Sequence, residues 1–435
     1  MGVEYVINIS NPCGEYLGND YNSCLLSSIN LYEIVSNKFS DKADINWGKL
    51  EDLVRMGINV LDETLDYGID SLPLEENKKC ATDWRAIGLG TLGMADMLIA
   101  LGLKYGSREA IDKLSEIFDF INITALDESC NLAKRKGAFE KYNWDYTKES
   151  LLIKSLIGEN NTLYEKIEQY GLRNGSLLSI APTGSTSLLL GGLSGGCEPL
   201  FKISYERSTH SMEKENKKFR VFAKSVRELL EYNNLPLDTS DSDIKKRFPF
   251  IIESHDIKPI DRILTQAVMQ EYVDNAISST VNLGNSATPN DIFDIYMKSW
   301  EQGLKGITVF RDGCKRGNIL GVTDKKDNEI VFDSIVPEKR RKIKKVNGNT
   351  YKKETSCVPS MYVTVNRNDK GDIFEVFTAT SSGCKANIGC LTRLVSYALR
   401  SGASVKGIIN ELKENKCEAC QLLKRKGNKE ISSSC

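Results

Sequence analysis

Residues 176–190 have the sequence SLLSIAPTGSTSLLL. Residues 176–180 predict a short buried strand, and the leucines at 188–190 predict the start of a helix. Between them, residues 181–187 include a proline, a glycine and four hydroxyl side chains. Free backbone amides at a helix N-terminus bind anions, and Ser and Thr hydroxyls add donors, so the stretch predicts a phosphate site. A simple Ser/Thr helix cap is an equally good interpretation of these residues alone.

Strands and helices alternate around this stretch. Apolar residues share one helical face at 50–65 and again at 111–121. Further on, helices are predicted at Asp261–Ala276 and Asn290–Gly303, followed by a strand at Gly306–Phe310. This alternation is typical of an α/β architecture.

The pentapeptide NPCGE at residues 11–15 follows a predicted short strand at Tyr5–Ile9. Its proline and glycine favour a tight loop that presents amide, thiol and carboxylate side chains together. Cys13 would be a redox atom and Glu15 a base. A plain turn with a structural cysteine is the alternative interpretation of these five residues.

The composition excludes several function classes. Lys plus Arg is 58 and Asp plus Glu is 59, a balance that does not indicate a nucleic acid as partner. No apolar run is long enough for a membrane span, and no secretory signal is visible. The 12 cysteines are therefore expected in a reducing cytoplasm, and only 2 histidines disfavour a site built on imidazole.

A second cysteine strengthens the interpretation of the pentapeptide. Cys24 lies in the stretch SCLLSSINL at residues 23–31. Together with NPCGE, this stretch resembles the active-site finger loop of ribonucleotide reductase large subunits, specifically the adenosylcobalamin-dependent class. In that family the loop carries the radical cysteine and one reducing cysteine. Residues 25–27 are Leu-Leu-Ser where the family commonly has Asn-Leu-Gly, but both cysteines are kept.

The resemblance continues along most of the chain. The glycines of IGLGTLGMAD, at residues 87–96, also fit a G-x-G-x-x-G pattern, but polar residues 77–83 precede them instead of a buried strand. We therefore do not expect a dinucleotide site there. Cys197 departs from the family's GIEPLF and is interpreted as a packed cysteine. The segments that resemble the family are residues 87–96, 181–187, 196–201, 280–283 and 303–313.

The last of these segments discriminates between reductase classes. The tyrosyl-radical class has two adjacent tyrosines here, which relay a radical from a second subunit. This sequence has Thr308 and Val309 instead. The resemblance therefore implies that the radical is generated locally by adenosylcobalamin.

The resemblance also implies the roles of the site residues. A thiyl radical on Cys13 would remove the ribose 3′ hydrogen, Glu15 would be the base on the 3′ hydroxyl, and Asn11 would orient the ribose hydroxyls. Cys24 and a second thiol would supply two electrons, renewed by a thioredoxin-like or glutaredoxin-like dithiol. The expected enzyme reduces ribonucleotides, with diphosphates favoured, to 2′-deoxyribonucleotides for DNA synthesis. The residues expected to bind the substrate phosphates are Thr183, Gly184, Ser185, Thr186 and Ser187.

The fold implied for residues 1–322 is the second half of the ten-stranded α/β barrel of ribonucleotide reductases, with the finger loop. In the family the thiol partner of Cys24 lies on the first barrel strand, which precedes the finger loop. We therefore expect a companion chain that carries the N-terminal half. The alternatives are a fragment of a tyrosyl-radical large subunit, or a non-catalytic fragment that binds zinc or a protein partner.

The remaining residues predict a linker and a second domain. Residues 323–349 are polar and strongly basic, which predicts a solvated linker. Residues 350–435 predict a small α+β domain, with strands at 361–365 and 374–378 and a helix at 391–400. The domain resembles a cysteine-containing module found at the ends of these reductases. The family segment usually contains Thr-Ser-Cys-Pro-Asp, whereas this sequence stops at the cysteine, so we expect a truncated module.

The cysteines of this domain have two possible roles. Cys417 and Cys420 have the spacing of half a zinc knuckle, and Cys357 and Cys435 would complete four thiolate ligands. The alternative is a mobile dithiol that re-reduces the active site by thiol–disulfide exchange.

Overall fold

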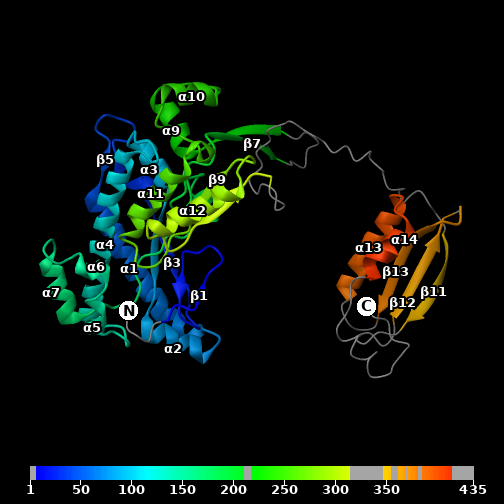
Figure 1. Cartoon of the computed structure of the whole chain (residues 1–435), viewed down its shortest axis with the longest axis horizontal. Helices are drawn as coiled ribbons and strands as arrows, with labels where there is room; N and C mark the ends of the chain where they lie inside the picture. Colours follow the sequence, from blue (N-terminus) through cyan, green and yellow to red (C-terminus); the bar gives the residue numbers. More distant parts are fainter. Residues whose placement is uncertain are drawn as a thin grey trace. The chain divides into compact units, whose positions relative to one another are not determined.

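The computed structural model describes residues 6–209, 217–313, 346–353, 361–368, 370–380 and 385–413 of the chain. The chain divides into two compact units, residues 1–322 and 323–435, and each is described by itself (Figure 1). In the described ranges, no helix combines the length and the apolar character that a membrane crossing requires.

The first unit is built around parallel strands. β3 (Leu26–Asn30) pairs in parallel with β6 (Gly88–Leu92). β9 (Thr280–Leu283) pairs in parallel with β10 (Thr308–Arg311). Residues 177–180 lie between these two pairs. Parallel strands joined by helices confirm the α/β prediction.

Two isolated parallel bridges join the pairs into one sheet. Leu178 pairs with Leu89 of β6, and Ile180 pairs with Ile277, just before β9. All four side chains are buried. The buried strand expected at 176–180 therefore takes part in the sheet, but through single bridges and not through a continuous ladder.

Helices connect the successive strands. α4 packs against both α1 and α11, and α11 also packs against α12. The two predicted apolar faces are confirmed, since α1 and α4 bury them in the main core. The bounds are α1 (Trp47–Gly68), α3 (Met94–Ala100), α4 (Arg108–Lys136), α11 (Pro259–Gln270) and α12 (Pro289–Glu301).

The helix expected to reach Ala276 ends at Gln270 instead. The Asp274 carboxylate accepts hydrogen bonds from two backbone amides of segment 177–180, at 2.7 Å each. The amide of Asn275 donates to a carbonyl of the same segment at 3.1 Å. Because these groups bond to the sheet, they do not continue the helix.

The remaining elements of the first unit are shorter. They are β1 (Ile9–Ser10), β2 (Leu17–Gly18), η1 (Leu31–Ile34), β4 (Val35–Ser36), β5 (Asp44–Ile45), η2 (Ile69–Ser71), α2 (Glu75–Trp84), α5 (Trp144–Thr147), α6 (Leu151–Lys154), α7 (Asn161–Tyr170), α8 (Gly184–Leu189), β7 (Ser204–Thr209), β8 (Lys217–Phe222), α9 (Lys224–Tyr232), α10 (Asp241–Arg247) and η3 (Ser254–Asp256).

Strand β6 requires glycine because the neighbouring segment approaches it closely. A Cβ on Gly90 would lie 2.4 Å from the carbonyl oxygen of Ser179, and one on Gly88 would lie 2.8 Å from the Ser179 Cβ. The element before β6 is the helix α2 and not a strand. The first two glycines of the G-x-G-x-x-G pattern are therefore required by strand packing.

The second unit is a small α+β domain, as predicted. Its antiparallel sheet has the order β11, β12, β13, and α13 packs on β13. Strand β11 begins before residue 350, so residues 347–349, which were assigned to the linker, belong to the domain. The bounds are β11 (Asn347–Lys353), β12 (Met361–Arg367), β13 (Ile373–Thr380), α13 (Lys385–Arg400) and α14 (Val405–Lys413).

The close approach at Gly90 gives a test of the sheet. Gly90→Ala should lower the free energy of unfolding by about 1–3 kcal/mol, because the added methyl group meets backbone that cannot move aside. Gly68→Ala, at the end of α1 with nothing within 4 Å of the new Cβ, is the control. Urea unfolding measures both variants, and equal stability of Gly90→Ala and wild type would contradict the packing.

Candidate active site

Cys13 lies in the loop of the antiparallel hairpin formed by β1 and β2. The strand expected over residues 5–9 begins only at Ile9, and the described residues 6–8 are not part of it. Its extent is set by pairing with β2 and not by the alternation of its own side chains. The hairpin presents Cys13 to solvent.

The side chain of Asn11 shapes this loop. Its Oδ1 accepts hydrogen bonds from the amides of Gly14, at 3.0 Å, and Tyr16, at 3.1 Å. The side-chain oxygen is therefore used inside the loop, in the manner of an Asx turn. The Nδ2 group of Asn11 is the part of the side chain that is left to meet a ligand.

The backbone of the hairpin is hydrogen-bonded to segment 177–180 and to residues 275–276. The carbonyl oxygen of Glu15 accepts a hydrogen bond from Ser179 Oγ at 2.7 Å and one from the Ala276 amide at 3.1 Å. The Leu17 amide donates to Asn275 Oδ1 at 2.8 Å. Three bonds from two neighbouring segments thus fix the backbone next to Cys13.

Glu15 carries a buried carboxylate. The residue is only 4% exposed, and its Oε2 has no hydrogen-bond partner among the described residues. A buried carboxylate oxygen without a partner is costly and is a common feature of functional sites. A Cβ on Gly306 would lie 3.4 Å from the Gly14 carbonyl, so the residues that lead into β10 lie beside the hairpin.

Cys24 lies close to this carboxylate. The Cys24 residue is exposed overall, yet the protein around its sulfur desolvates the thiol. This desolvation and the negative charge of Glu15 raise the pKa of Cys24 to about 11. Cys24 is therefore a protonated thiol at neutral pH. The charge effect places Cys24 near Glu15 of the hairpin, while the reducing role of Cys24 stays a prediction.

The other described cysteines of the first unit are buried. Cys80 Sγ donates to Asn19 Oδ1 at 3.4 Å, Cys130 Sγ to a backbone carbonyl at 3.3 Å, and Cys197 Sγ to the Ser278 carbonyl at 3.3 Å. Cys197 is fully buried, which agrees with its interpretation as a packed cysteine. In the part of the first unit that the structure describes, Cys13 and Cys24 are the exposed thiols.

The predicted phosphate loop, residues 181–187, joins segment 177–180 to helix α8. Gly184, Ser185 and Thr186 are exposed, and the backbone amides of a first helical turn have no partner within the helix. Ser187 differs from the expectation, because its hydroxyl is buried and donates to the Gly184 carbonyl at 3.1 Å. Thr183 Oγ1 accepts from the Gly196 amide at 2.8 Å.

One element positions both parts of the site. Ser179 holds the backbone of Glu15, and Ala181 begins the phosphate loop two residues later. Ligands of open α/β sheets bind at the carboxyl ends of the strands. Segment 177–180 thus bonds to the backbone of Glu15 and continues directly into the phosphate loop.

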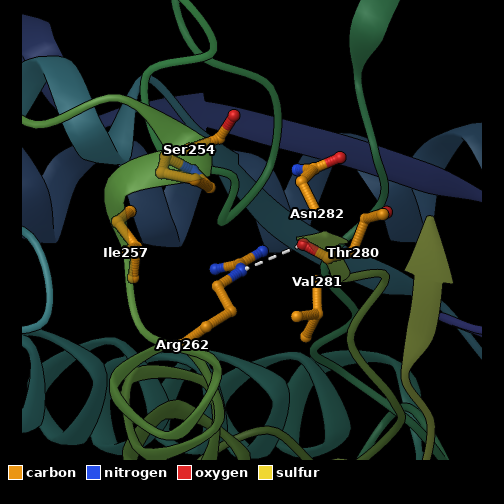
Figure 2. Close-up of a pocket in the computed structure, with 7 residues that line it drawn as sticks. Ser254, Ile257, Arg262, Thr280, Val281 and Asn282 are labelled. Atoms are coloured by element: carbon orange, nitrogen blue, oxygen red, sulfur yellow. Dashed lines mark hydrogen bonds between the residues drawn. The ribbon is translucent and has the colours of Figure 1, made fainter. Parts of the chain in front are cut away.

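Sequence reasoning missed one buried polar residue near the site. Arg262 of α11 lines a small pocket, and Figure 2 shows its side chain reaching toward β9, with Nε donating to the Thr280 carbonyl at 3.4 Å. The sequence did contain a signal for this residue, because Arg262 lies among the apolar residues of an amphipathic helix, where a cation is unusual. The pocket is lined by Pro199, Ser254, Ile257, Arg262, Thr280, Val281 and Asn282.

The predicted zinc ligands lie outside the described residues. This applies to all four, Cys357, Cys417, Cys420 and Cys435. In the ranges that are described, no group of three or more His, Cys, Asp or Glu side chains could hold a metal ion. The zinc site and the redox shuttle both stay predictions.

Two family models match the chain. Residues 3–310 match the model described as "Ribonucleotide reductase, barrel domain". Residues 335–435 match the model of the TSCPD domain. The first match covers the hairpin, the phosphate loop and both pairs of parallel strands.

Curated proteins give the same picture. The chain is 30% identical over 355 residues to a vitamin B12-dependent ribonucleoside-diphosphate reductase of Thermoplasma acidophilum, covering 78% of this chain and 42% of that protein. It is 31% identical over 331 residues to a protein of the same name from Mycobacterium tuberculosis, covering 72% and 43%. A ribonucleoside-diphosphate reductase subunit alpha of Chlamydia pneumoniae is 29% identical over 337 residues, covering 69% and 31%. The chain thus spans less than half the length of these relatives.

The raised pKa of Cys24 gives a test of the site geometry. At pH 8 its thiolate fraction should be about hundredfold below that of an ordinary cysteine, because two pKa units separate them. Iodoacetamide should therefore alkylate Cys24 slowly in the folded chain and at an ordinary rate in urea. Glu15→Gln should speed the reaction in part, since the negative charge is the smaller of the two causes. Mass spectrometry of the Cys24 peptide measures these rates, and an unchanged rate in Glu15→Gln would place the carboxylate elsewhere.

Proposed function

Because the chain belongs to the ribonucleotide reductase family through its barrel domain, we propose that it carries the active-site half of a ribonucleoside-diphosphate reductase. The proposed reaction replaces the 2′ hydroxyl of the ribose with hydrogen. Two thiols supply two electrons and become a disulfide, and the hydroxyl leaves as water. The observation that carries the proposal is the buried carboxylate of Glu15, without a partner among the described residues, beside the exposed thiol of Cys13.

The hairpin residues have distinct roles in this reaction. As a thiyl radical, Cys13 takes the hydrogen from the ribose 3′ carbon. Glu15 Oε2 accepts the proton of the 3′ hydroxyl, which helps the 2′ hydroxyl to leave. The Nδ2 group of Asn11 donates to a ribose hydroxyl, since its Oδ1 is used in the loop. The Cys13 thiol finally returns the hydrogen to the 3′ carbon.

Cys24 supplies one of the two reducing thiols. A pKa of about 11 keeps it protonated at neutral pH, so it can give a proton to the departing 2′ hydroxyl. Its sulfur then forms a disulfide with a second thiol, and the two sulfurs lose two electrons in total. An external dithiol of thioredoxin-like or glutaredoxin-like chemistry restores both thiols by thiol–disulfide exchange.

The phosphate loop binds the part of the substrate that does not react. The amides at the start of α8 and the hydroxyls of Ser185 and Thr186 are exposed donors for a diphosphate. Since Ser179 ties Glu15 to the strand that precedes this loop, binding energy from the phosphates positions the ribose over the hairpin.

The proposed cofactor is adenosylcobalamin. A radical generated by a bound cofactor fits this chain, because Gly306 lies beside the hairpin and the strand that follows carries Thr308 and Val309, not a tyrosine relay. Cys13 is also exposed, so a cofactor from solution can reach its sulfur. When bound, adenosylcobalamin would supply the carbon-centred radical that oxidises the Cys13 thiol. The missing tyrosines disfavour the tyrosyl-radical class.

Further polypeptide would complete the barrel. Among the described strands, β3 pairs only with β6, and β10 pairs only with β9, so each has an open edge. Open edges of parallel strands are normally covered or closed into a barrel. A companion chain would supply the missing strands and the thiol that pairs with Cys24. The proposed location is the cytoplasm, where the free thiols of the described residues would stay reduced.

Substitution of the hairpin tests this function. With the companion polypeptide, adenosylcobalamin and dithiothreitol present, the chain should convert cytidine diphosphate to the deoxynucleotide. Cys13→Ser should abolish the reaction, and Glu15→Gln should slow it by about 10²–10⁴-fold, because the base is lost. Cys390→Ser, which removes an exposed cysteine of the second unit, is the matched control. Full turnover by Cys13→Ser would contradict the mechanism, and full turnover without the companion would contradict the need for it.

A further inference from the structure

Arg262 is a buried cation whose bonds all converge on one region. The residue is only 2% exposed. Its Nη1 donates to the Cys197 carbonyl at 2.8 Å and also contacts the Tyr105 hydroxyl, while Nη2 donates to Glu198 Oε2 at 2.8 Å. Tyr105 itself donates to the Cys197 carbonyl at 2.9 Å. The planar guanidinium of Arg262 thus joins helix α11 to residues 197–198 by two hydrogen bonds.

Glu198 links its own segment to both helix α11 and strand β9. Its second oxygen, Oε1, accepts from the Thr280 amide at the start of β9 at 2.9 Å. Burial raises the pKa of Glu198 and lowers the pKa of Arg262, so desolvation opposes both charges. Arg262 is buried and the Glu198 side chain is 25% exposed. An ion pair that is desolvated in this way is a poor source of stability, and its best-attested use is to fix one arrangement.

Residues 197–198, which Arg262 contacts, directly follow the two glycines that pack on the phosphate loop. A Cβ on Gly195 would lie 2.3 Å from the Pro182 carbonyl, and one on Gly196 would lie 2.5 Å from the Ala181 carbonyl. The backbone of residues 195–196 therefore packs directly on the backbone of the loop. A shift of Cys197 would move this contact.

Thr183 depends on the same contact. It has a φ of +48°, a left-handed conformation that is strained for a β-branched residue. Its Oγ1 accepts the Gly196 amide at 2.8 Å, and its carbonyl accepts the Ser187 amide at 2.8 Å as α8 begins. Such strained conformations persist only where the surrounding structure holds them.

We propose that the Arg262–Glu198 pair is a positioning device for the substrate phosphates. The pair fixes residues 195–198, which hold Thr183 in its left-handed conformation and so set the course of residues 184–186, whose exposed groups we assign to the substrate phosphates. Arg262 and Glu198 touch no substrate in this role. The inference rests on the proposed function, since it concerns the same phosphate loop.

The test is the affinity of the chain with its companion polypeptide for cytidine diphosphate, measured by titration calorimetry. Arg262→Gln should weaken binding by about tenfold or more, because a small misplacement of the loop is costly. Arg262→Lys, which keeps the charge but loses the planar guanidinium, should recover part of the affinity. Hydrogen exchange should show faster exchange of the Gly196 amide in Arg262→Gln. If that variant does not fold, Glu198→Gln carries the same expectation.

Two controls separate the possible failures. Thr186→Ala alters the loop itself, and Arg85→Gln removes another buried arginine, which pairs with Asp62 at 2.5 Å. No binding by wild type, or full affinity of Thr186→Ala, would reject the phosphate loop and with it this inference. Weak binding by Thr186→Ala together with full affinity of Arg262→Gln would reject the positioning role alone. An equal loss in Arg85→Gln would also reject it, because the effect would then be general destabilisation.

Discussion

The hydrogen bonds that Ser179 and Ala276 donate to the Glu15 carbonyl are the contacts on which the site depends. They turn a hairpin of two-residue strands, which would be unstable alone, into a fixed part of the sheet. They also place the reactive loop over the segment that continues into the phosphate loop. A site held by strand backbone in this way keeps its geometry better than one held by loops.

At two places around this contact, charged groups are desolvated and their partners do not fully offset the cost. Glu15 keeps one carboxylate oxygen without a partner among the described residues, and desolvation together with the Glu15 charge raises the pKa of the neighbouring Cys24 thiol. Arg262 and Glu198 form an ion pair where apolar side chains could fill the same space. Each arrangement is unfavourable for folding alone, and each lies beside a loop that we assign to substrate. We infer that these groups are kept for the chemistry and its geometry.

The sequence predicted those features that depend on local pattern. The apolar faces of α1 and α4 follow from helical spacing. The interest of Cys13 and Cys24 follows from the resemblance of their motifs to the family. The end of α11 at Gln270 could not be foreseen, because it is set by the bonds of Asp274 to a segment about one hundred residues earlier. The sequence already disfavoured a nucleotide motif around Gly90, but it could not show that the close approach of Ser179 is what requires glycine there. The role of Arg262 depends on contacts between distant elements, which no local pattern records.

The most direct test of the account follows the hydrogen on the ribose 3′ carbon. Cytidine diphosphate carrying deuterium at this position is reduced by the chain with its companion polypeptide, adenosylcobalamin and dithiothreitol. The account predicts slower turnover with the deuterated substrate and a product that keeps deuterium at the 3′ carbon, because Cys13 removes the atom and returns it. Product formation with no isotope effect, or at an equal rate in Cys13→Ser, would contradict the assignment of Cys13 as the radical site.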